Sequence, residues 1–450
     1  MTSRTLMRLA IAAGAGAAGA YAASRPTLMS WPGRIRPAVV GSLTAAAAGT
    51  TYVVAGAAGL RASTPPPSVR VRRVAIATAG SVAGIALVRG GLSLARARLT
   101  PAGRAIEEGV AQPPTAVELS GGPGSVVPFG TVGREGARFL HSSVPGDVIE
   151  QVSGRPPTAI GVRVFVGFDS AMTPQERVDL ALEELRRTGA YDRSRLLIGA
   201  PAGSGYANST PVDVLEILTG GDCAAVAVGY GLLPSFLSLD RVALAAQTQR
   251  LLIEGITADL AQRVTRPRVL LYGESLGARV QEAAVARGTA DLDAFGVAAA
   301  LWVGTPGGAE SVAFHAAVAG ESITVDRPEQ IPAVLPLPRP RVWFLEHDGD
   351  PVVRFAPDVA YRRPEWLAQE PRGRNVPEGM LWSPGITWVQ VLVDTLFATH
   401  VRPGLFESRG HDYRADLGAV VTAAYDLPCD VATAERLETA LRSLEVARAQ

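Results

Sequence analysis

Cysteine and histidine are scarce in this chain of 450 residues. It contains two cysteines, Cys223 and Cys429, and five histidines scattered along the sequence. Two cysteines cannot build a disulfide framework, and neither residue type occurs at the spacing of a structural metal site. We therefore expect no disulfide scaffold, no metal and no cofactor. Cys223 lies in an apolar, strand-like run, which predicts a small core residue.

An excess of charge of one sign is also lacking. The 43 Lys and Arg residues are balanced by 42 Asp and Glu residues, which gives a formal net charge of +1. Proteins that bind nucleic acid usually show a basic patch or a basic excess. The composition therefore gives no reason to expect a nucleic-acid partner, and it does not indicate an oligomeric state.

Charge is entirely absent from one long stretch near the N-terminus. Residues 37–60 contain no charged side chain and are bounded by Arg36 and Arg61. About 20 apolar residues suffice to cross a bilayer as a helix. Residues 9–23 and 74–88 are shorter uncharged runs. We predict a transmembrane region over residues 1–99, with candidate spans 9–23, 37–60 and 74–88, and hence a multi-pass membrane protein.

Two alternatives remain open for this region. Arg4 and Arg8 precede residues 9–23, and Ala20-Tyr-Ala22 resembles a cleavage site, so this run could be a signal peptide. A buried, Ala-rich pair of soluble helices is the other alternative. The orientation in the membrane does not follow, because arginines are shared almost equally between the two sides.

The remainder of the chain alternates between strand and helix patterns from about residue 160. The linker is expected at 100–128, the catalytic domain at 129–428 and a C-terminal helix at 429–450. The alternation predicts an α/β fold with a mostly parallel sheet and helices on both faces. The expected strands are residues 162–166, 196–198, 224–228, 269–272, 297–303 and 341–346. The expected helices include one capped by Thr173 and Glu176, and residues 212–218, 239–264, 278–286 and 417–424.

A Gly-x-Ser-x-Gly turn follows the strand expected at 269–272. Its sequence is Gly273-Glu-Ser-Leu-Gly277. A strand, this turn and a helix form the nucleophile elbow of an α/β hydrolase, in which the serine is exposed at the end of the sheet. Gly273 and Gly277 would avoid collisions with the neighbouring strand and helix. Ser275 is thus the candidate nucleophile; an ordinary Gly-rich turn is the alternative.

An acid and a histidine follow in the order that this fold requires. The strand expected at 341–346 runs into His347-Asp-Gly-Asp350, in which Asp350 precedes proline and is the candidate acid; Asp348 is a weaker candidate. His411 lies in a polar loop before the helix at 417–424. The order Ser275, Asp350, His411 is that of a hydrolase triad. The other histidines are expected to be structural or at the surface, with His347 as a candidate support for the site.

An oxyanion hole needs two backbone donors. The amide of Leu276 lies at the start of the helix after Ser275, so it is the first candidate. Ala202 and Gly203, in the Gly-rich loop after the strand at 196–198, are candidates for the second donor. The loop after residues 162–167, with Asp169 and Ser170, is the competitor.

Two long segments flank Asp350. Residues 306–340 occur where this fold commonly carries a lid. Residues 351–401 contain Trp366, Trp382 and Trp388, which is half of the six tryptophans. These side chains either pack a small core of their own, or form an apolar acyl-binding wall or a contact with the membrane interface.

The motifs taken together resemble a known family: bacterial, largely actinobacterial, α/β hydrolases with several transmembrane helices at the N-terminus. The resemblance covers roughly residues 126–413. It includes Gly133-Arg-Glu-Gly136, Val166-Gly-Phe-Asp-Ser-Ala171, Leu301-Trp-Val-Gly304, Arg363-Pro-Glu-Trp366 and Gly410-His-Asp-Tyr413, besides the elbow and Asp350-Pro-Val. It implies an alpha/beta-hydrolase fold with Ser275, Asp350 and His411 as the triad, in a bacterial cell membrane.

The function expected from these features is that of a membrane-anchored serine ester hydrolase. Ser275 would attack an acyl carbonyl while His411 takes its proton and Asp350 orients the imidazole. A bilayer anchor favours a lipid-like or other hydrophobic ester as substrate and membrane lipid as a neighbour. The alternatives are an acyltransferase with the same triad and a catalytically silent interaction protein on a hydrolase scaffold.

Overall fold

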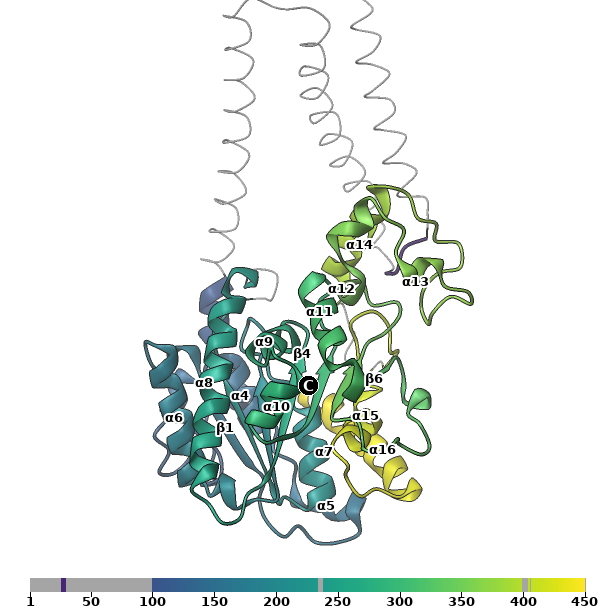
Figure 1. Cartoon of the computed structure of the whole chain (residues 1–450). Coiled ribbons are helices and arrows are strands. Elements are labelled where there is room, and N and C mark those ends of the chain that lie inside the picture. The colour runs from purple at the N-terminus through teal and green to yellow at the C-terminus, as the bar shows by residue number, and fades with distance from the viewer. Residues whose placement is uncertain (1–25, 30–98, 234–237, 399–403, 405, 450) are drawn as a thin grey trace, which may run out of the picture. The chain divides into compact units, whose positions relative to one another are not determined.

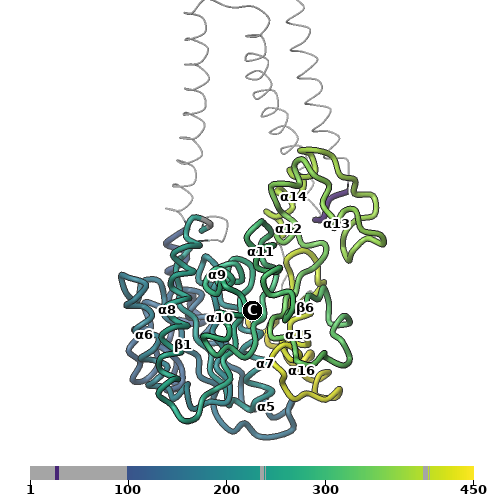
Figure 2. The backbone as a smooth tube through the Cα atoms, in the orientation of Figure 1, coloured from purple at the N-terminus to yellow at the C-terminus, as the bar shows by residue number. Residues whose placement is uncertain are grey.

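The computed structural model describes residues 26–29, 99–233, 238–398, 404 and 406–449 (Figures 1 and 2). The chain divides into two compact units. One comprises residues 1–97 and 356–397, and the other comprises residues 98–355 and 398–450. The expected spans at 9–23, 37–60 and 74–88, and the alternative signal peptide, lie outside the described residues. Within the described ranges, no helix is both long enough and apolar enough to cross a membrane.

A seven-stranded parallel sheet forms the centre of the larger unit. The strands lie in the order β1-β3-β2-β4-β5-β7-β6. They are β1 (Val162–Val166), β2 (Arg195–Ala200), β3 (Cys223–Val228), β4 (Arg268–Glu274), β5 (Val297–Val303), β6 (Ser322–Val325) and β7 (Val342–Leu345). Because β4 is the fourth of seven, the strand that leads into the Gly-x-Ser-x-Gly turn is flanked by three strands on each side.

Helices cover both faces of this sheet (Figure 1). The helices of this unit are α4 (Gly133–His141), α5 (Gly146–Ser153), α6 (Pro174–Arg187), α7 (Thr210–Thr219), α8 (Val242–Ala261), α9 (Leu276–Ala284), α10 (Thr289–Ala294), α11 (Ala309–Val318), α12 (Pro351–Arg354), α15 (Leu417–Ala424) and α16 (Val431–Ala449). The helices α6, α8 and α9 pack together in one layer, and α5, α7, α15 and α16 pack together in another. Parallel strands buried on both faces explain why the strand sequences are almost wholly apolar.

The predicted α/β fold is confirmed, and the structure agrees with the expected strands to within a few residues. The capping box at the start of α6 is also present: the Thr173 side chain accepts from the Glu176 amide, and the Glu176 carboxylate accepts from the Thr173 amide. Cys223 is buried in β3, as expected. Where periodicity and capping residues coincide, the local sequence determines the element.

Some elements differ from the expectation. The segment 306–340 contains α11 and also β6, which extends the sheet by pairing with β7. The helix expected at 239–264 begins with a 3-10 turn at Leu239–Arg241 and then continues as α8 to Ala261. The strand β6 has only four residues and lies at the edge of the sheet, so its sequence carries little of the apolar pattern of a central strand.

The described part of the smaller unit comprises residues 26–29 and 356–397. It contains α13 (Glu365–Ala368) and α14 (Ile386–Phe397). The Leu28 amide donates to Oδ2 of Asp394 on α14 at 2.9 Å, and the Leu28 side chain is fully buried. The Trp382 indole donates to the Val359 carbonyl at 3.0 Å, a hydrogen bond within the segment 356–397.

A buried charge cluster connects β1 to α7 in the larger unit. The Arg163 side chain is fully buried and donates to Glu216 and Asp213, with N–O distances of 2.8 and 2.9 Å to Glu216 and 2.8 Å to Asp213. Arg448 on α16 reaches the same Asp213 carboxylate at 2.6 Å. Burial alone would lower the pKa of Arg163, but the two carboxylates outweigh it and raise this pKa. Because these side chains are buried, each charge is stabilised by its ion-pair partners rather than by water.

We predict that Arg163→Met destabilises the protein strongly, because it leaves Asp213 and Glu216 buried with part of their countercharge removed. The expected loss is about 3–5 kcal/mol in the free energy of unfolding, measured by denaturant titration. Arg186→Met is the matched control, since Arg186 pairs with Asp259 but is half exposed, and it should cost less than about 1 kcal/mol. Equal losses in the two variants would contradict the prediction.

Candidate active site

Ser275 lies at the sharp turn between β4 and α9. Its backbone has φ 55° and ψ −126°, a positive φ that a residue other than glycine rarely adopts. A Cβ on Gly273 would lie 2.6 Å from the Ala278 Cα, and a Cβ on Gly277 would lie 2.1 Å from the Ala200 carbonyl oxygen. Neither position has space for a side chain, so the two glycines permit the turn that places Ser275 at the carboxyl end of the sheet.

The neighbouring strand fixes the position of this turn. The Ser275 amide donates to the Val303 carbonyl, the last residue of β5, at 2.8 Å. The next residue, Gly304, has φ 56°, and a Cβ there would lie 2.6 Å from Cε1 of His411. Val303 thus holds the Ser275 backbone, and its neighbour Gly304 packs against the His411 ring.

Asp350 and His411 are joined directly. Nδ1 of His411 donates to Oδ2 of Asp350 at 2.7 Å, and both side chains are buried. The Val352 amide donates to Oδ1 of Asp350 at 2.8 Å, which orients the carboxylate as the cap of α12. With its proton on Nδ1, the neutral imidazole has a free lone pair on Nε2.

The lone pair on Nε2 of His411 accepts no hydrogen bond from the described residues. Nε2 of His411 is buried and makes no hydrogen bond with any described residue, Ser275 included. The structure therefore brings His411 and Asp350 into contact. The Ser275 amide is bonded to Val303, and the next residue, Gly304, packs against the His411 ring. The structure contains no hydrogen bond between Ser275 and His411.

Asp348, the weaker acid candidate, has a different role in the structure. Its carboxylate pairs with Arg354 at 3.1 Å, and its amide donates to Asp326. Asp350, by contrast, accepts the hydrogen bond from Nδ1 of His411. Among the acids near the end of β7, Asp350 is thus the partner of the histidine.

Tyr413 and His347 complete the setting of Asp350. The Tyr413 hydroxyl donates to Oδ2 of Asp350 at 2.6 Å and accepts from the His347 amide at 3.1 Å. The His347 ring stacks on Tyr413 at 3.9 Å, and its nitrogens face the Gly410 carbonyl and the Asp416 carboxylate. The loop that carries His411 is therefore held on both sides of that residue.

The sequence singled out His347 as a candidate support but gave Tyr413 no role. The signal available for Tyr413 was its position two residues after His411. That spacing alone does not show that its hydroxyl returns to Asp350, because Asp350 lies 63 residues earlier in the chain.

Charge and burial act against each other at His411. Burial alone would lower the pKa of the imidazole, but the charge of Asp350 and its hydrogen bond raise it, and Glu274 and Asp412 add to this effect. The net result is a pKa above the ordinary value of 6.5. The environment thus favours a proton on His411 more than water does.

The candidate oxyanion donors differ in availability. The Leu276 amide, at the start of α9, has no acceptor among the described residues. The Ala202 amide already donates to the Tyr206 carbonyl at 2.8 Å, so it is not a free donor in this structure. The Gly203 amide has no acceptor among the described residues, and Gly203 is buried against Ser238.

The loop after β2 nevertheless begins beside the elbow, because a Cβ on Gly277 would lie 2.1 Å from the Ala200 carbonyl oxygen and 3.2 Å from that of Pro201. The competing loop after β1 does not lie there. The strands β3 and β2 separate β1 from β4. Asp169 in that loop pairs with Arg104 at 2.6 Å, and the Ser170 hydroxyl bonds to Thr131.

Two further buried carboxyl groups lie near the elbow, and the sequence did not single them out. Glu282, on α9, accepts from the Thr305 hydroxyl at 2.9 Å, and burial raises its pKa to about 8. Glu346 follows β7, and burial raises its pKa to about 7. In both groups burial disfavours the ionised form and outweighs the opposing effect of a nearby arginine, Arg279 for Glu282 and Arg354 for Glu346.

We predict that Gly304→Ala displaces the His411 ring and breaks its bond to Asp350, because the new methyl group would overlap the ring. The downfield proton NMR signal expected from the hydrogen-bonded Nδ1 proton of His411 should therefore disappear. Gly296→Ala is the matched control: Gly296 also has a positive φ of 63°, but a Cβ there meets nothing within 4 Å. If both variants keep the resonance, or both lose it, the steric argument fails.

Comparison with known proteins agrees with this architecture. Residues 162–437, more than half of the chain, match a family model described as "Alpha/beta-hydrolase family". Residues 23–143 match a second model described as "Alpha/beta-hydrolase family N-terminus". No curated protein and no solved structure matches the chain. By the matched family model, its parallel sheet and its Gly-x-Ser-x-Gly turn, the chain belongs to the alpha/beta-hydrolase family.

Proposed function

We propose that this protein is a membrane-anchored serine hydrolase that cleaves a lipid-like or other hydrophobic ester. The observation that carries the proposal is the bond from His411 to Asp350 at 2.7 Å, which leaves the buried Nε2 as the only unused nitrogen of the ring. A histidine held in this tautomer beside a strained Ser275 is the arrangement that a general base needs.

In the proposed reaction, Ser275 Oγ attacks the ester carbonyl carbon as Nε2 of His411 takes the hydroxyl proton. The negative charge that develops on the carbonyl oxygen faces the Leu276 amide, with Gly203 as the second donor. His411 then gives the proton to the departing alcohol, which leaves an acyl group on Ser275. Water attacks this acyl-enzyme by the same steps, which releases the acid and restores the serine.

Asp350 acts through His411. Its carboxylate fixes the proton on Nδ1 and stabilises the imidazolium that forms when Nε2 takes the serine proton. The hydroxyl of Tyr413 holds this carboxylate in place from the other side. Because both partners are buried, little water competes for these bonds.

The membrane and substrate parts of the proposal depend on the sequence. Residues 37–60 are uncharged and long enough to cross a bilayer. An anchor of this kind would keep the site near lipids and other hydrophobic esters. The same triad serves an acyltransferase when an alcohol replaces water at the second step, so product analysis with competing alcohols separates the two activities.

We predict that an alkyl fluorophosphonate probe labels the full-length protein and that Ser275→Ala abolishes the labelling. Fluorophosphonates react with a serine only when a neighbouring base activates it. Ser443→Ala is the control, because Ser443 is an exposed serine on α16, and it should label like the unmodified protein. Folded protein that does not label would support the catalytically silent scaffold instead.

We also predict a displaced pH profile. The base must be unprotonated, so kcat/KM should fall as the pH drops through the pKa of His411. Because Asp350 raises this pKa, the acid limb should have its midpoint above 6.5. The measurement is the hydrolysis rate of a p-nitrophenyl ester against pH.

The companion variant is Asp350→Asn, which removes both the charge and the acceptor for the Nδ1 proton. It should lower kcat by about 10⁴-fold. Asp348→Asn, two residues away, removes a carboxylate that pairs with Arg354, and it should retain most activity. If Asp348→Asn lost more activity than Asp350→Asn, the assignment of Asp350 as the acid would be wrong.

A further inference from the structure

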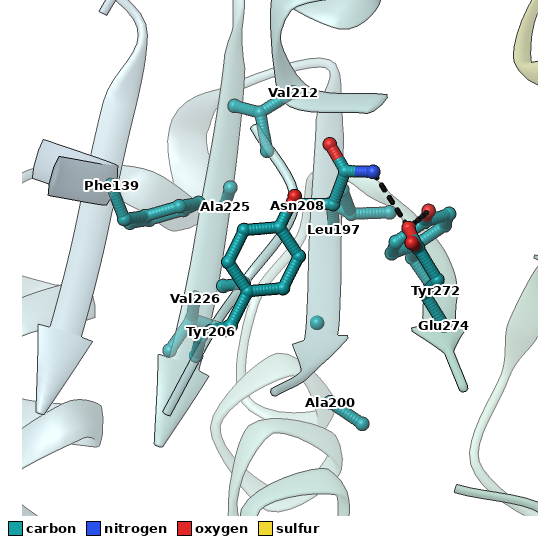
Figure 3. Close-up of a pocket in the computed structure, with 13 residues that line it drawn as sticks. Phe139, Leu197, Ala200, Tyr206, Asn208, Val212, Ala225, Val226, Tyr272 and Glu274 are labelled. Carbon is teal, nitrogen blue, oxygen red and sulfur yellow. Dashed lines mark hydrogen bonds between the residues drawn. The ribbon is translucent and has the colours of Figure 1, made fainter. Parts of the chain in front are cut away.

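A small cavity lies on the sheet beside the elbow (Figure 3). Its walls come from the ends of β2, β3 and β4, from α4 and α7, and from the loop after β2, and they include Glu274 and Ala200. We call it the Glu274 pocket. Its volume is about 20 Å³, which is enough for roughly one water-sized group.

The walls are mostly apolar. They include the side chains of Phe139, Leu197, Val212 and Ala225. Figure 3 shows the Glu274 carboxylate and the Asn208 amide together at one side of the pocket. Glu274 is the one acidic side chain in the lining.

The carboxylate of Glu274 is held by one of its two oxygens. Nδ2 of Asn208 donates to Oε2 at 2.6 Å, and the Tyr272 hydroxyl donates to the same Oε2 at 2.7 Å. Oε1 receives no hydrogen bond from any described residue. Glu274 is half-buried, and Oε1 is not shut off from water. The geometry therefore fixes one oxygen and leaves the other able to accept a hydrogen bond from water or from a bound group.

The position of this oxygen connects it to the reaction. Glu274 is the residue directly before Ser275, so the two Cα atoms are about 3.8 Å apart. The charge of Glu274 also acts on His411. One small molecule can therefore reach both Glu274 and Ser275.

We propose that the Glu274 pocket binds a compact hydrogen-bond donor of the substrate, a hydroxyl or a primary ammonium group close to the ester, through Oε1 of Glu274. This proposal rests on the proposed function and narrows its substrate to hydrophobic esters that carry such a group. A trimethylammonium group is excluded on two grounds: it exceeds the volume of one water-sized group, and it has no hydrogen to donate.

The test measures how small molecules protect Ser275 from an alkyl fluorophosphonate in the full-length protein. The competitors are n-propylammonium, 1-propanol and tetramethylammonium, at matched ionic strength. We expect propylammonium or propanol to slow the labelling while tetramethylammonium does not. The more effective of the two identifies the donor as ammonium or hydroxyl.

Glu274→Gln should weaken protection by propylammonium by about tenfold, because a charge-assisted bond is replaced by a neutral one. Glu254→Gln is the matched control, since it removes an exposed carboxylate on α8 that pairs with Arg250, and it should keep the protection of the unmodified protein. Ala225→Val keeps Glu274 but fills part of the pocket, so it should reduce protection by both donors. It also tests the proposal if Glu274→Gln fails to fold.

The outcomes separate the two proposals. If the unmodified protein does not label, the proposed hydrolase function is wrong. If it labels but neither donor protects it, or tetramethylammonium protects it equally, the pocket proposal alone is wrong. Protection that persists unchanged in both Glu274→Gln and Ala225→Val would also overturn the pocket proposal.

Discussion

The site depends on three glycines at positions where neighbouring groups leave no space for a side chain. Around Ser275, the β-carbon positions of Gly273, Gly277 and Gly304 are occupied by the α9 backbone, the Ala200 carbonyl and the His411 ring. This close packing draws the ends of β2, β4 and β5 together at one point. A strained serine, a helix N-terminus and a histidine ring then share a small volume, and none of them could do so if the chain carried ordinary side chains at these three positions.

The sheet supplies the rigidity that such packing requires. The strand β4 lies at its centre and is buried, and α9 packs against it. Gln281 on α9 also donates to the Ile198 carbonyl of the neighbouring β2, and Tyr425, which follows α15, donates to the Leu271 carbonyl of β4. The elbow thus extends from the central strand of the sheet. The histidine and the acid come from loops, but Tyr413 and His347 tie those loops to the end of β7.

Much of the fold could be predicted from the sequence, because its signals are local. The apolar runs of β1 to β5, the Thr173 cap and the glycines of the elbow each act within a few residues of where they stand. The strand β6 was missed because four residues at an edge carry little pattern. The engagement of the Ala202 amide with the Tyr206 carbonyl could not be foreseen either, since it depends on how the loop closes on itself.

The contacts that span long sequence distances could not be predicted. Arg163 reads as an ordinary polar residue in a strand, yet its partners lie 50 and 53 residues away on α7. The oxygen of Glu274 that faces no donor is equally invisible in the sequence, where Glu274 is only the variable residue before a serine. In both cases the sequence gives the chemistry of the side chain, and the fold alone gives the neighbours.

Glu282 and Glu346 make folding a proton-consuming event near neutral pH. In the unfolded chain each carboxyl group has an ordinary pKa of 4.5, whereas in the folded protein burial raises the two values to about 8 and about 7. Between 4.5 and these values the folded state holds protons that the unfolded state has released, so stability decreases as the pH rises through this window. Mildly acidic conditions therefore favour the folded state at these two groups, whereas the proposed role of His411 as a base requires a pH above its raised pKa.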